Sequence, residues 1–523
     1  MLDLGCYILN RNNFKEIDKM NTFKKIVAML LSLMIVFSCV SMSVSAASKK
    51  TDYPVIYVHG FMASDILSDK NDPESTPYWP MQTDNIVSAV KSAVPALAKL
   101  IIKQDWDEFG EALVPVVEKI FTGLFNGKDG EPQGESGTYC YYPTKKEIKN
   151  SDEVTFRYDW RRDPIAVAKD LDKFINHVIK VSGQKKVSIS CHSQGGVITL
   201  AYLTLYGSSK IHGVVFDAAA IYGQTFNGNL LSGKLDFEGE AFLYTLESMF
   251  IGDDNELLID SIFEILEEAG LMDAVANLGD GIVDKIRPYL YASLASLFAC
   301  WPSIWAMVPD DMIDEAMDFV FTEIYDKNDP QSKKLIKKIK NYNNKIRSKR
   351  EETLLALDET SKVAVITRYG FTTMPLTPSW KSHSDGNVDV VSGSFGATTL
   401  EYGKTFSEDY LAKANKKYIS PDKTIDASTC LFPEKTWFVR NLQHSVSCDG
   451  IDPMIYQLLD YEKEASVRSF KKYPRFMKYD AATDDIVPDD ETVEIRVPEG
   501  DMKDKIIFFG KALIQALKTA LAK

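Results

Sequence analysis

Short runs of apolar and β-branched residues alternate with longer helix-forming runs in the first half of the chain. Strands are expected over Pro54–Val58, Glu153–Arg157, the run before Cys191 and Gly213–Phe216, and helices over Ile165–Val181 and Val197–Tyr206. Continuous apolar strands separated by helices are typical of a parallel sheet covered on both faces. The pattern therefore predicts an α/β fold with right-handed crossover connections.

The regular alternation stops after Asp217 and resumes far downstream. Residues 225–350 carry mainly helical apolar stripes and end in a Lys-rich helix, before strands are expected again at Lys362–Arg368 and Thr436–Arg440. A sheet covered on both faces has no free face for further helices, so we expect this segment to form a helical cap over the strand ends. A second independent domain is the alternative.

The N-terminal region has the pattern of a secretory signal. Lys24 and Lys25 precede the apolar run Ile26–Val40, and small residues follow through Ala46 and Ala47. We expect cleavage after Ala46, with translation starting at Met20, and export of the mature protein. An uncleaved membrane anchor is the alternative, although the apolar run is short for a membrane span.

These features predict five segments. They are a signal peptide (1–46), the first half of an α/β core (47–224), a helical cap (225–355), the second half of the core (356–465) and a C-terminal extension (466–523).

Composition restricts the function. The chain has 523 residues, is 45% hydrophobic and carries a net charge of −14, which argues against nucleic acid as a partner. Five cysteines follow the signal segment, and their number and spacing predict neither a disulfide framework nor a metal site. Cys430 and Cys448 bracket the run that contains His444, so a single bridge there and free buried thiols remain equal alternatives. We expect no metal or organic cofactor.

The strand ending at Cys191 meets a helix at a turn that carries Ser193. The sequence Cys191-His192-Ser193-Gln194-Gly195 follows the pattern small-x-Ser-x-Gly, with cysteine in place of the first glycine. A sharp turn between a strand and a helix lifts a serine hydroxyl above the strand ends and places it near the amides of the helix N-terminus. Ser193 is therefore the candidate nucleophile, and it requires a base and an acid elsewhere.

The base and the acid are sought downstream, because proteins with this turn carry them in the order Ser, Asp, His. His444 follows the strand expected at Thr436–Arg440, and Asp385 lies in a turn beyond the strand Lys362–Arg368. We favour Asp385 as the acid over Asp217 and Asp389. Of the other histidines, we expect His59 and His192 to be packed near the site, and His177, His212 and His383 to lie outside it.

Several segments together carry a resemblance to one family. They are Tyr158-Asp159-Trp160-Arg161, His192 to Gly196, Trp301-Pro302-Ser303 with Trp305 and Pro309, Arg368-Tyr369-Gly370 and Asp385-Gly386-Asn387-Val388. In this order they resemble the lecithin:cholesterol acyltransferase family, which includes lysosomal phospholipase and plant phospholipid:diacylglycerol acyltransferase. The resemblance covers the chain from about Tyr53 to about Tyr461.

The resemblance implies an α/β-hydrolase fold, a serine acyl-enzyme and lipid esters as substrates. It also implies an oxyanion hole formed by the backbone amides of Phe61 and Gln194. We therefore expect a secreted serine lipase or esterase that uses Ser193, Asp385 and His444. The alternatives are a lipid O-acyltransferase with the same triad, a peptidase of the same fold, and a non-catalytic relative that binds a lipid or a cell-wall component.

Apolar segments that the sheet does not need suggest contact with a lipid–water interface. They are Ile86–Ile102, Phe109–Phe125 and Leu297–Val308, the last with Trp301 and Trp305. A helix with one wide apolar face either packs into a core or lies on an interface. We expect these segments to contact the interface.

Overall fold

The computed structural model describes residues 51–80, 106–151, 153–235, 285, 288–289, 296–374 and 377–489. The expected signal peptide, the segment Ile86–Ile102 and residues 236–284 of the expected cap lie outside the described residues.

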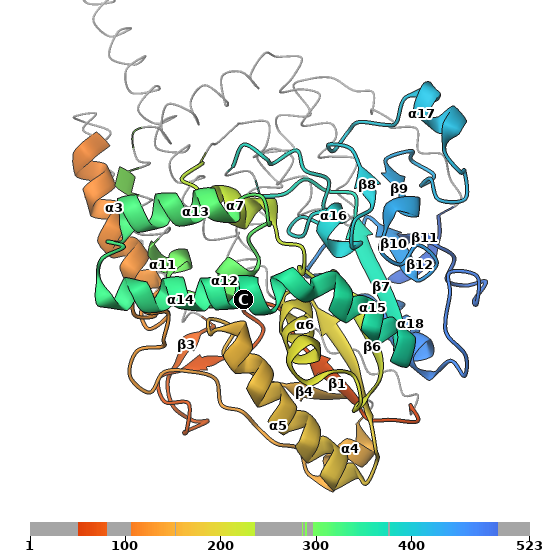
Figure 1. The fold of residues 1–523 in the computed structure, drawn as a ribbon, viewed down its shortest axis with the longest axis horizontal. Coiled ribbons are helices and arrows are strands. Elements are labelled where there is room, and N and C mark those ends of the chain that lie inside the picture. The colour runs from red at the N-terminus through yellow and green to blue at the C-terminus, as the bar shows by residue number, and fades with distance from the viewer. Residues whose placement is uncertain are drawn as a thin grey trace, which may run out of the picture.

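Eight strands form one mostly parallel sheet in the order β12-β11-β10-β7-β6-β5-β1-β4 (Figure 1). Seven of them run parallel to one another, and the edge strand β12 runs antiparallel to them, paired with β11. The strands are β1 (Val55–Val58), β4 (Glu153–Phe156), β5 (Val187–His192), β6 (Ile211–Asp217), β7 (Lys362–Tyr369), β10 (Thr436–Arg440), β11 (Phe476–Asp480) and β12 (Asp485–Pro488). Two short antiparallel pairs lie outside this sheet, β2 (Ile66–Leu67) with β3 (Pro77–Trp79) and β8 (Thr398–Thr399) with β9 (Ile425–Asp426).

Helices cover the sheet on both sides, as the sequence predicts. On one side α5 (Pro164–Ser182), α6 (Gln194–Tyr206) and α15 (Arg350–Thr360) pack next to one another (Figure 1). The other side is covered by α18 (Ile451–Asp460), which packs against β6. Alternate strand residues point to opposite sides, so that Val214 joins the core beneath α6 while Val215 joins the core beneath α18.

The remaining helices are short or lie away from the sheet. They are α3 (Trp106–Ile120), α4 (Lys145–Asn150), α7 (Thr225–Leu231), α11 (Ser296–Ala299), α12 (Pro302–Ala306), α13 (Ile313–Phe319), α14 (Pro330–Lys345), α16 (Val390–Gly393) and α17 (Glu408–Lys413). A π-helical turn over Val320–Ile324 follows α13, and 3-10 turns lie at Arg347–Lys349 and Ala427–Thr429.

Local sequence signals set the ends of α5. The Asp163 carboxylate accepts a hydrogen bond from the Ile165 amide, and Pro164 occupies the first helical position, where no backbone donor is needed. The helix ends at Gly183, whose φ of 77° lies in the left-handed region. The helix expected over Ile165–Val181 therefore begins and ends within one or two residues of the prediction.

The structure differs from the expected boundaries at two places. Strands β11 and β12 belong to the main sheet, so the core continues past residue 465 to residue 488 at least, and residues 490–523 of the expected extension lie outside the described residues. The Arg440 guanidinium holds the end of this region through a paired contact with buried Asp489 at 2.8 and 2.9 Å. At the other boundary, α15 packs on α6 and β7, so it is a core helix although the expected cap runs to residue 355.

The segment Leu297–Val308 is buried, so it does not make the contact with an interface that was expected of it. Trp301 is 0% exposed and Trp305 is 1% exposed. Their indole N–H groups donate to the carbonyls of Leu124 and Ala299 at 2.9 and 2.8 Å. Burial removes both rings from water while each indole N–H keeps a hydrogen-bond acceptor, so the core is the more stable location for these side chains.

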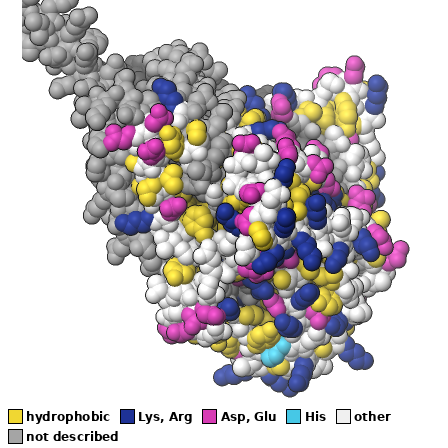
Figure 2. Space-filling model, turned by 60° about the vertical axis from the view of Figure 1, so that its left-hand side comes forward, with side chains coloured by type: hydrophobic (Ala, Val, Ile, Leu, Met, Phe, Trp, Pro, Cys, Tyr) yellow, Lys and Arg dark blue, Asp and Glu magenta, His cyan; other side chains and the backbone are white. Residues whose placement is uncertain are grey.

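One face of the described part of the chain is mixed in charge. Figure 2 shows acidic and basic side chains interspersed over the described part of one face, with apolar side chains in small groups between them. Within the described ranges, no helix combines the length and the apolar character that crossing a membrane requires.

The five described cysteines are all free thiols, and four of them are buried. The bridge between Cys430 and Cys448 that the sequence left open is therefore not formed. Both side chains instead fill core positions, in two different apolar clusters.

Helix α6 approaches β1 closely at Gly195. A Cβ added to this residue would lie 1.9 Å from the Val58 carbonyl oxygen and 2.8 Å from that of His59. Both neighbours are backbone atoms, which cannot move aside as a flexible side chain can. Only glycine therefore allows the helix to start directly above the first strand.

We predict that Gly195→Ala lowers the free energy of unfolding by about 3 kcal/mol, because overpacking against backbone forces helix and strand apart. Chemical denaturation followed by circular dichroism measures the change. Gly393→Ala is the matched control, because a Cβ there would meet its neighbours only at ordinary contact distances of 3.5 Å and more. Equal stabilities for the two variants would contradict the close-approach account.

Candidate active site

Ser193 occupies a strained turn between β5 and α6. Its φ of 54° and ψ of −123° lie in a region that residues with a side chain rarely adopt. The turn is held from both sides, because the Ser193 amide donates to the Asp217 carbonyl at 3.1 Å and the Ser193 carbonyl accepts from Ala220 at 3.2 Å. The fold thus maintains the conformation that presents the hydroxyl at the carboxyl end of the sheet.

The three residues predicted as nucleophile, base and acid meet at this turn. His444 Nε2 lies 2.9 Å from Ser193 Oγ, and His444 Nδ1 lies 2.7 Å from Asp385 Oδ2. All three side chains are buried. They come from the end of β5, from a turn beyond β7 and from the loop after β10, so the sheet brings together residues that are far apart in the chain.

The turn at Asp385 fixes the direction of its carboxylate. Oδ1 accepts hydrogen bonds from the amides of Asn387 at 3.0 Å and Val388 at 2.7 Å, which leaves Oδ2 for His444. The Asp385 carbonyl also accepts from the His444 amide at 2.8 Å. This arrangement keeps a proton on Nδ1 and leaves the Nε2 lone pair facing the Ser193 hydroxyl.

Asp217, the main alternative for the acid, has different partners. Its carboxylate accepts from Arg368 Nε at 3.0 Å and Nη2 at 2.6 Å, and it lies 2.9 Å from His192 Nδ1. Burial opposes its ionisation, but Arg368 and His192 outweigh burial and hold the pKa of Asp217 well below its usual range. Asp217 is therefore an ionised partner of Arg368, and its oxygens face His192 where those of Asp385 face His444.

Arg368 also forms hydrogen bonds to the loop that contains His444, a role that the sequence analysis did not predict. Its Nη1 donates to the carbonyls of Gln443 and His444 at 3.1 Å each and of Val446 at 2.7 Å. The loop that holds His444 is thus fastened to β6 and β7 through a buried guanidinium. The only signal in the sequence was the place of Arg368 in one of the segments that carry the family resemblance.

Asp389, the other alternative acid, has Thr225 as its partner. It accepts from the Thr225 amide at 2.8 Å and from the Thr225 hydroxyl at 2.7 Å. Burial raises the pKa of Asp389 to about 6. These contacts tie the start of α7 to the turn that follows Asp385.

The amides predicted for the oxyanion hole lie beside the nucleophile. Gln194 is the first residue of α6, and a Cβ on Gly60 would lie 2.9 Å from Ser193 Cβ, so the peptide group that supplies the Phe61 amide is next to the serine. Among the described residues, no hydrogen-bond acceptor is found for either amide N–H. As far as the described residues go, both donors can bind an oxygen atom that carries negative charge.

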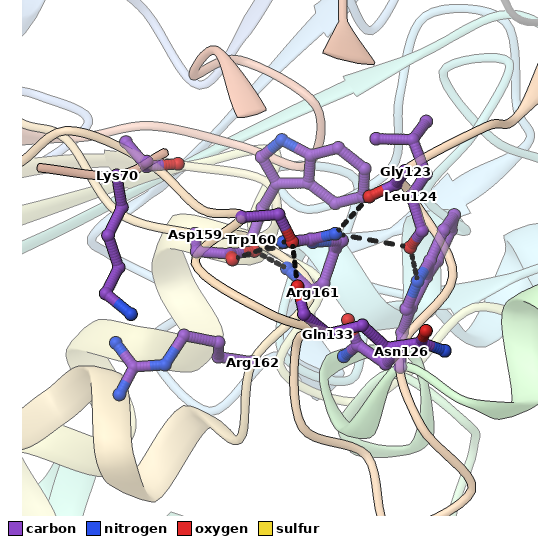
Figure 3. A network of polar contacts seen from close by, with 12 residues as sticks. Lys70, Gly123, Leu124, Asn126, Gln133, Asp159, Trp160, Arg161 and Arg162 are labelled. Atoms are coloured by element: carbon purple, nitrogen blue, oxygen red, sulfur yellow. Dashed lines mark hydrogen bonds and ion pairs between the residues drawn. The ribbon is translucent and has the colours of Figure 1, made fainter. Parts of the chain in front are cut away.

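A buried polar network centred on Arg161 (Figure 3) includes Trp160, whose ring packs against that of Phe61. Arg161 pairs with Asp159 through two contacts of 2.8 and 3.0 Å, and its Nη1 donates to the carbonyls of Gly123 and Leu124. The Trp160 indole donates to the Ser64 carbonyl at 3.0 Å. The network fastens the loop after α3 and the loop after β1 to the end of β4.

The remaining histidines lie outside the triad. His192 packs beside it, with its ring centroid 4.7 Å from that of His444. His59 and His383 are buried, and burial lowers the pKa of each to about 4. His177 contacts the Pro143 carbonyl at 2.8 Å, and His212 lies against Tyr53. Within the described ranges, no group of three or more His, Cys, Asp or Glu side chains is arranged to hold a metal ion.

The sheet and this site define the class. A mostly parallel eight-stranded sheet flanked by helices, with a nucleophile turn after β5, is the α/β-hydrolase fold. A serine, a histidine and an aspartate joined in a relay at the carboxyl end of that sheet are the arrangement of a serine hydrolase.

One family model matches the part of the chain that contains the nucleophile turn. Residues 161–236 match a family model described as serine aminopeptidase, S33. No curated protein sequence matches the chain.

Three solved structures are similar to parts of the chain. One is described as the Tle4–Tli4 complex, with 16% identity over 35% of this chain and 48% of the other, and a TM-score of 0.19. An esterase from Thermogutta terrifontis has 10% identity over 79% of this chain and 86% of its own, with a TM-score of 0.17. A putative aryl esterase from Burkholderia cenocepacia has 14% identity over 60% and 94%, with a TM-score of 0.14. The chain thus spans about half the length of the first of these.

We predict that Ser193→Ala and His444→Ala each lower kcat by roughly a million-fold, because either change removes the activated nucleophile. Asp385→Asn should lower kcat by about ten-thousand-fold, since an amide favours the wrong tautomer of His444. Steady-state kinetics on a soluble p-nitrophenyl ester measures all three. Near wild-type turnover in Ser193→Ala would exclude this site.

Asp217→Asn should lower stability strongly and kcat less than the triad variants do. It leaves the Arg368 charge buried without its partner, so we predict a loss of stability of about 3 kcal/mol. The kcat should fall by roughly a hundred-fold or less, because the loop of His444 is displaced while the relay remains chemically intact. Denaturation and kinetics on both variants distinguish the roles. If Asp217→Asn abolishes turnover while Asp385→Asn leaves it nearly unchanged, the acid is Asp217.

Proposed function

We propose that the protein is a secreted serine esterase of the lipase type, which hydrolyses ester bonds of lipids through an acyl-enzyme. The observation that carries the proposal is the relay of contacts from Ser193 Oγ through His444 to Asp385, at 2.9 and 2.7 Å, on a strained turn. A buried serine with an ordinary structural role needs neither the strained backbone nor the aligned imidazole.

The chemistry follows from this geometry. His444 Nε2 accepts the proton of Ser193 as Oγ attacks the ester carbonyl, and Asp385 stabilises the imidazolium that forms. The amides of Phe61 and Gln194 bind the oxyanion, each contributing about 3–4 kcal/mol to the lowering of the barrier. His444 then gives its proton to the departing alcohol, which leaves Ser193 acylated.

A second nucleophile completes the reaction. Water, activated by His444, attacks the acyl-enzyme and releases the acid and free Ser193. An acceptor alcohol in the same position would give acyl transfer instead, with the same residues in the same roles. We favour hydrolysis, because an exported enzyme works in contact with water.

Lipid esters are favoured because the segments that carry the family resemblance gather around the site. Ser193, Asp385 and Arg368 form or support the relay. The Phe61 ring packs against those of Trp160 and Trp301, with centroids 4.7 and 5.7 Å away. Of these three rings Phe61 alone is partly exposed, and a ring at that position suits an apolar acyl group. Contact with a lipid surface, if the substrate is presented on one, would have to use residues other than the buried Trp301 and Trp305.

A peptidase of the same fold is the second candidate, because the matching family model is described as a serine aminopeptidase. The matched residues 161–236 contain the nucleophile turn, α5, α6 and α7. These elements position a nucleophile in either kind of enzyme and do not define the substrate.

The proposal predicts turnover of p-nitrophenyl esters that increases from acetate to a longer acyl chain, together with release of fatty acid from phospholipid or triacylglycerol emulsions. Amino-acid p-nitroanilides, which test for an aminopeptidase, should not be cleaved. Ser193→Ala is the control for contaminating activity. Cleavage of the anilides without cleavage of any ester would favour the peptidase, and turnover of acetate esters alone would exclude the lipid substrate.

Export requires its own test. The proposal predicts that protein recovered from the culture medium begins at Ala47, because small residues flank the bond after Ala46. Intact-mass spectrometry measures the start of the chain. Full-length protein recovered from the membrane fraction would show that the N-terminal segment is an anchor.

A further inference from the structure

Three side chains outside the triad are hydrogen-bonded to one another or to the backbone beside the oxyanion-hole amides. They are His59, Tyr158 and Gln194, and all three are buried. We propose that they are positioning residues that hold the Phe61 and Gln194 amides at a fixed separation for the oxyanion. The inference rests on the proposed acyl-enzyme mechanism and assigns its positioning residues.

His59 fixes the orientation of the Phe61 amide. Its Nδ1 lies 2.7 Å from the Gly60 carbonyl oxygen, and its Nε2 lies 2.5 Å from Ser64 Oγ. The Gly60 carbonyl and the Phe61 N–H belong to one planar peptide group, so a bond to the oxygen determines where the N–H points. Since burial lowers the pKa of His59 to about 4, the neutral ring donates from Nδ1 and accepts from Ser64 at Nε2.

Tyr158 joins the loop after β1 to the nucleophile helix. Its hydroxyl lies 2.7 Å from the His59 carbonyl and 3.1 Å from Gln194 Oε1, and the single proton is shared between these two acceptors. Its ring stacks on His59 with centroids 4.3 Å apart and an angle of 9° between the planes. Because burial raises the pKa of Tyr158 well above its usual value, the hydroxyl remains a donor.

Gln194 completes the connection. Its Nε2 donates to the Trp160 carbonyl at 3.1 Å, which turns Oε1 toward Tyr158. The same residue supplies the second amide of the oxyanion hole. One tyrosine hydroxyl therefore connects the peptide that precedes the first donor with the residue that carries the second.

The spacing of the two donors matters most in the transition state. An oxyanion must lie about 2.7–3.1 Å from both N–H groups at once, whereas a substrate carbonyl carries less charge and depends less on them. Loss of the Tyr158 hydroxyl should therefore weaken binding of a tetrahedral species more than binding of the substrate.

Tyr158→Phe tests this directly, because it removes one oxygen and keeps the stacked ring. We expect kcat on a p-nitrophenyl ester to fall roughly ten-fold, as for the loss of one buried hydrogen bond, with KM within about two-fold of the wild type. The inhibition constant of phenylboronic acid, which forms a tetrahedral adduct with an active-site serine, should rise by the same factor as kcat falls. Tyr202→Phe is the matched control and should change neither value, because it removes a hydroxyl from a different buried tyrosine, which lies on α6.

A second pair of variants tests His59. An asparagine places an amide donor close to the position of Nδ1, whereas leucine offers no donor. We expect His59→Asn to retain more kcat and more affinity for the boronic acid than His59→Leu. The pH profile of kcat/KM should be that of the wild type in every active variant, because His444 and Asp385 are unchanged.

The outcomes separate the two proposals. If the wild type neither hydrolyses esters nor binds the boronic acid, the proposed function fails and this inference fails with it. If the wild type is active, the inference alone is overturned by a Tyr158→Phe enzyme with unchanged kcat. It is also overturned by a fall in kcat without loss of boronic acid affinity, or by equal losses in the two His59 variants.

Discussion

The packing of α6 directly onto β1 at Gly195 is the constraint on which the site depends. No side chain fits between that residue and the Val58 carbonyl, so the helix begins immediately above the strand and the chain must turn sharply at Ser193. The turn is strained, and hydrogen bonds to Asp217 and Ala220 hold it in place. Strain maintained in this way is found where the surrounding structure requires one conformation.

Two buried polar networks extend from this turn in different directions. One runs from Asp217 through Arg368 to the loop that carries His444 and holds the base. The other runs from Gln194 through Tyr158 to His59 and holds the amides of the expected oxyanion hole. Because the members of each network are buried and hydrogen-bonded to one another, displacement of one member costs more than the loss of a single contact.

The sequence predicted the features that depend on residues close together in the chain, such as the buried strands and the ends of helices. Apolar runs such as Val55–Val58 could be assigned to a buried parallel sheet, and Asp163 with Pro164 set the start of α5. The order of the expected triad followed from the turn at Ser193. By contrast, β11 reads Phe-Met-Lys-Tyr-Asp, a short run with charged residues that does not stand out as a strand of the main sheet. Periodicity also could not distinguish a buried Trp301 from one at an interface, because both situations need the same apolar face.

The role of Arg368 could not be predicted for a different reason. Its partners Asp217 and His444 lie 151 and 76 residues away, and only the assembled sheet brings them together.

The central claim, that Ser193 is a nucleophile activated by His444, is tested most directly by covalent labelling with an alkyl fluorophosphonate. The account predicts one label per chain, located on the peptide that contains Ser193, and loss of labelling in folded His444→Ala. Labelling at another residue, or none in the folded wild type, would contradict it.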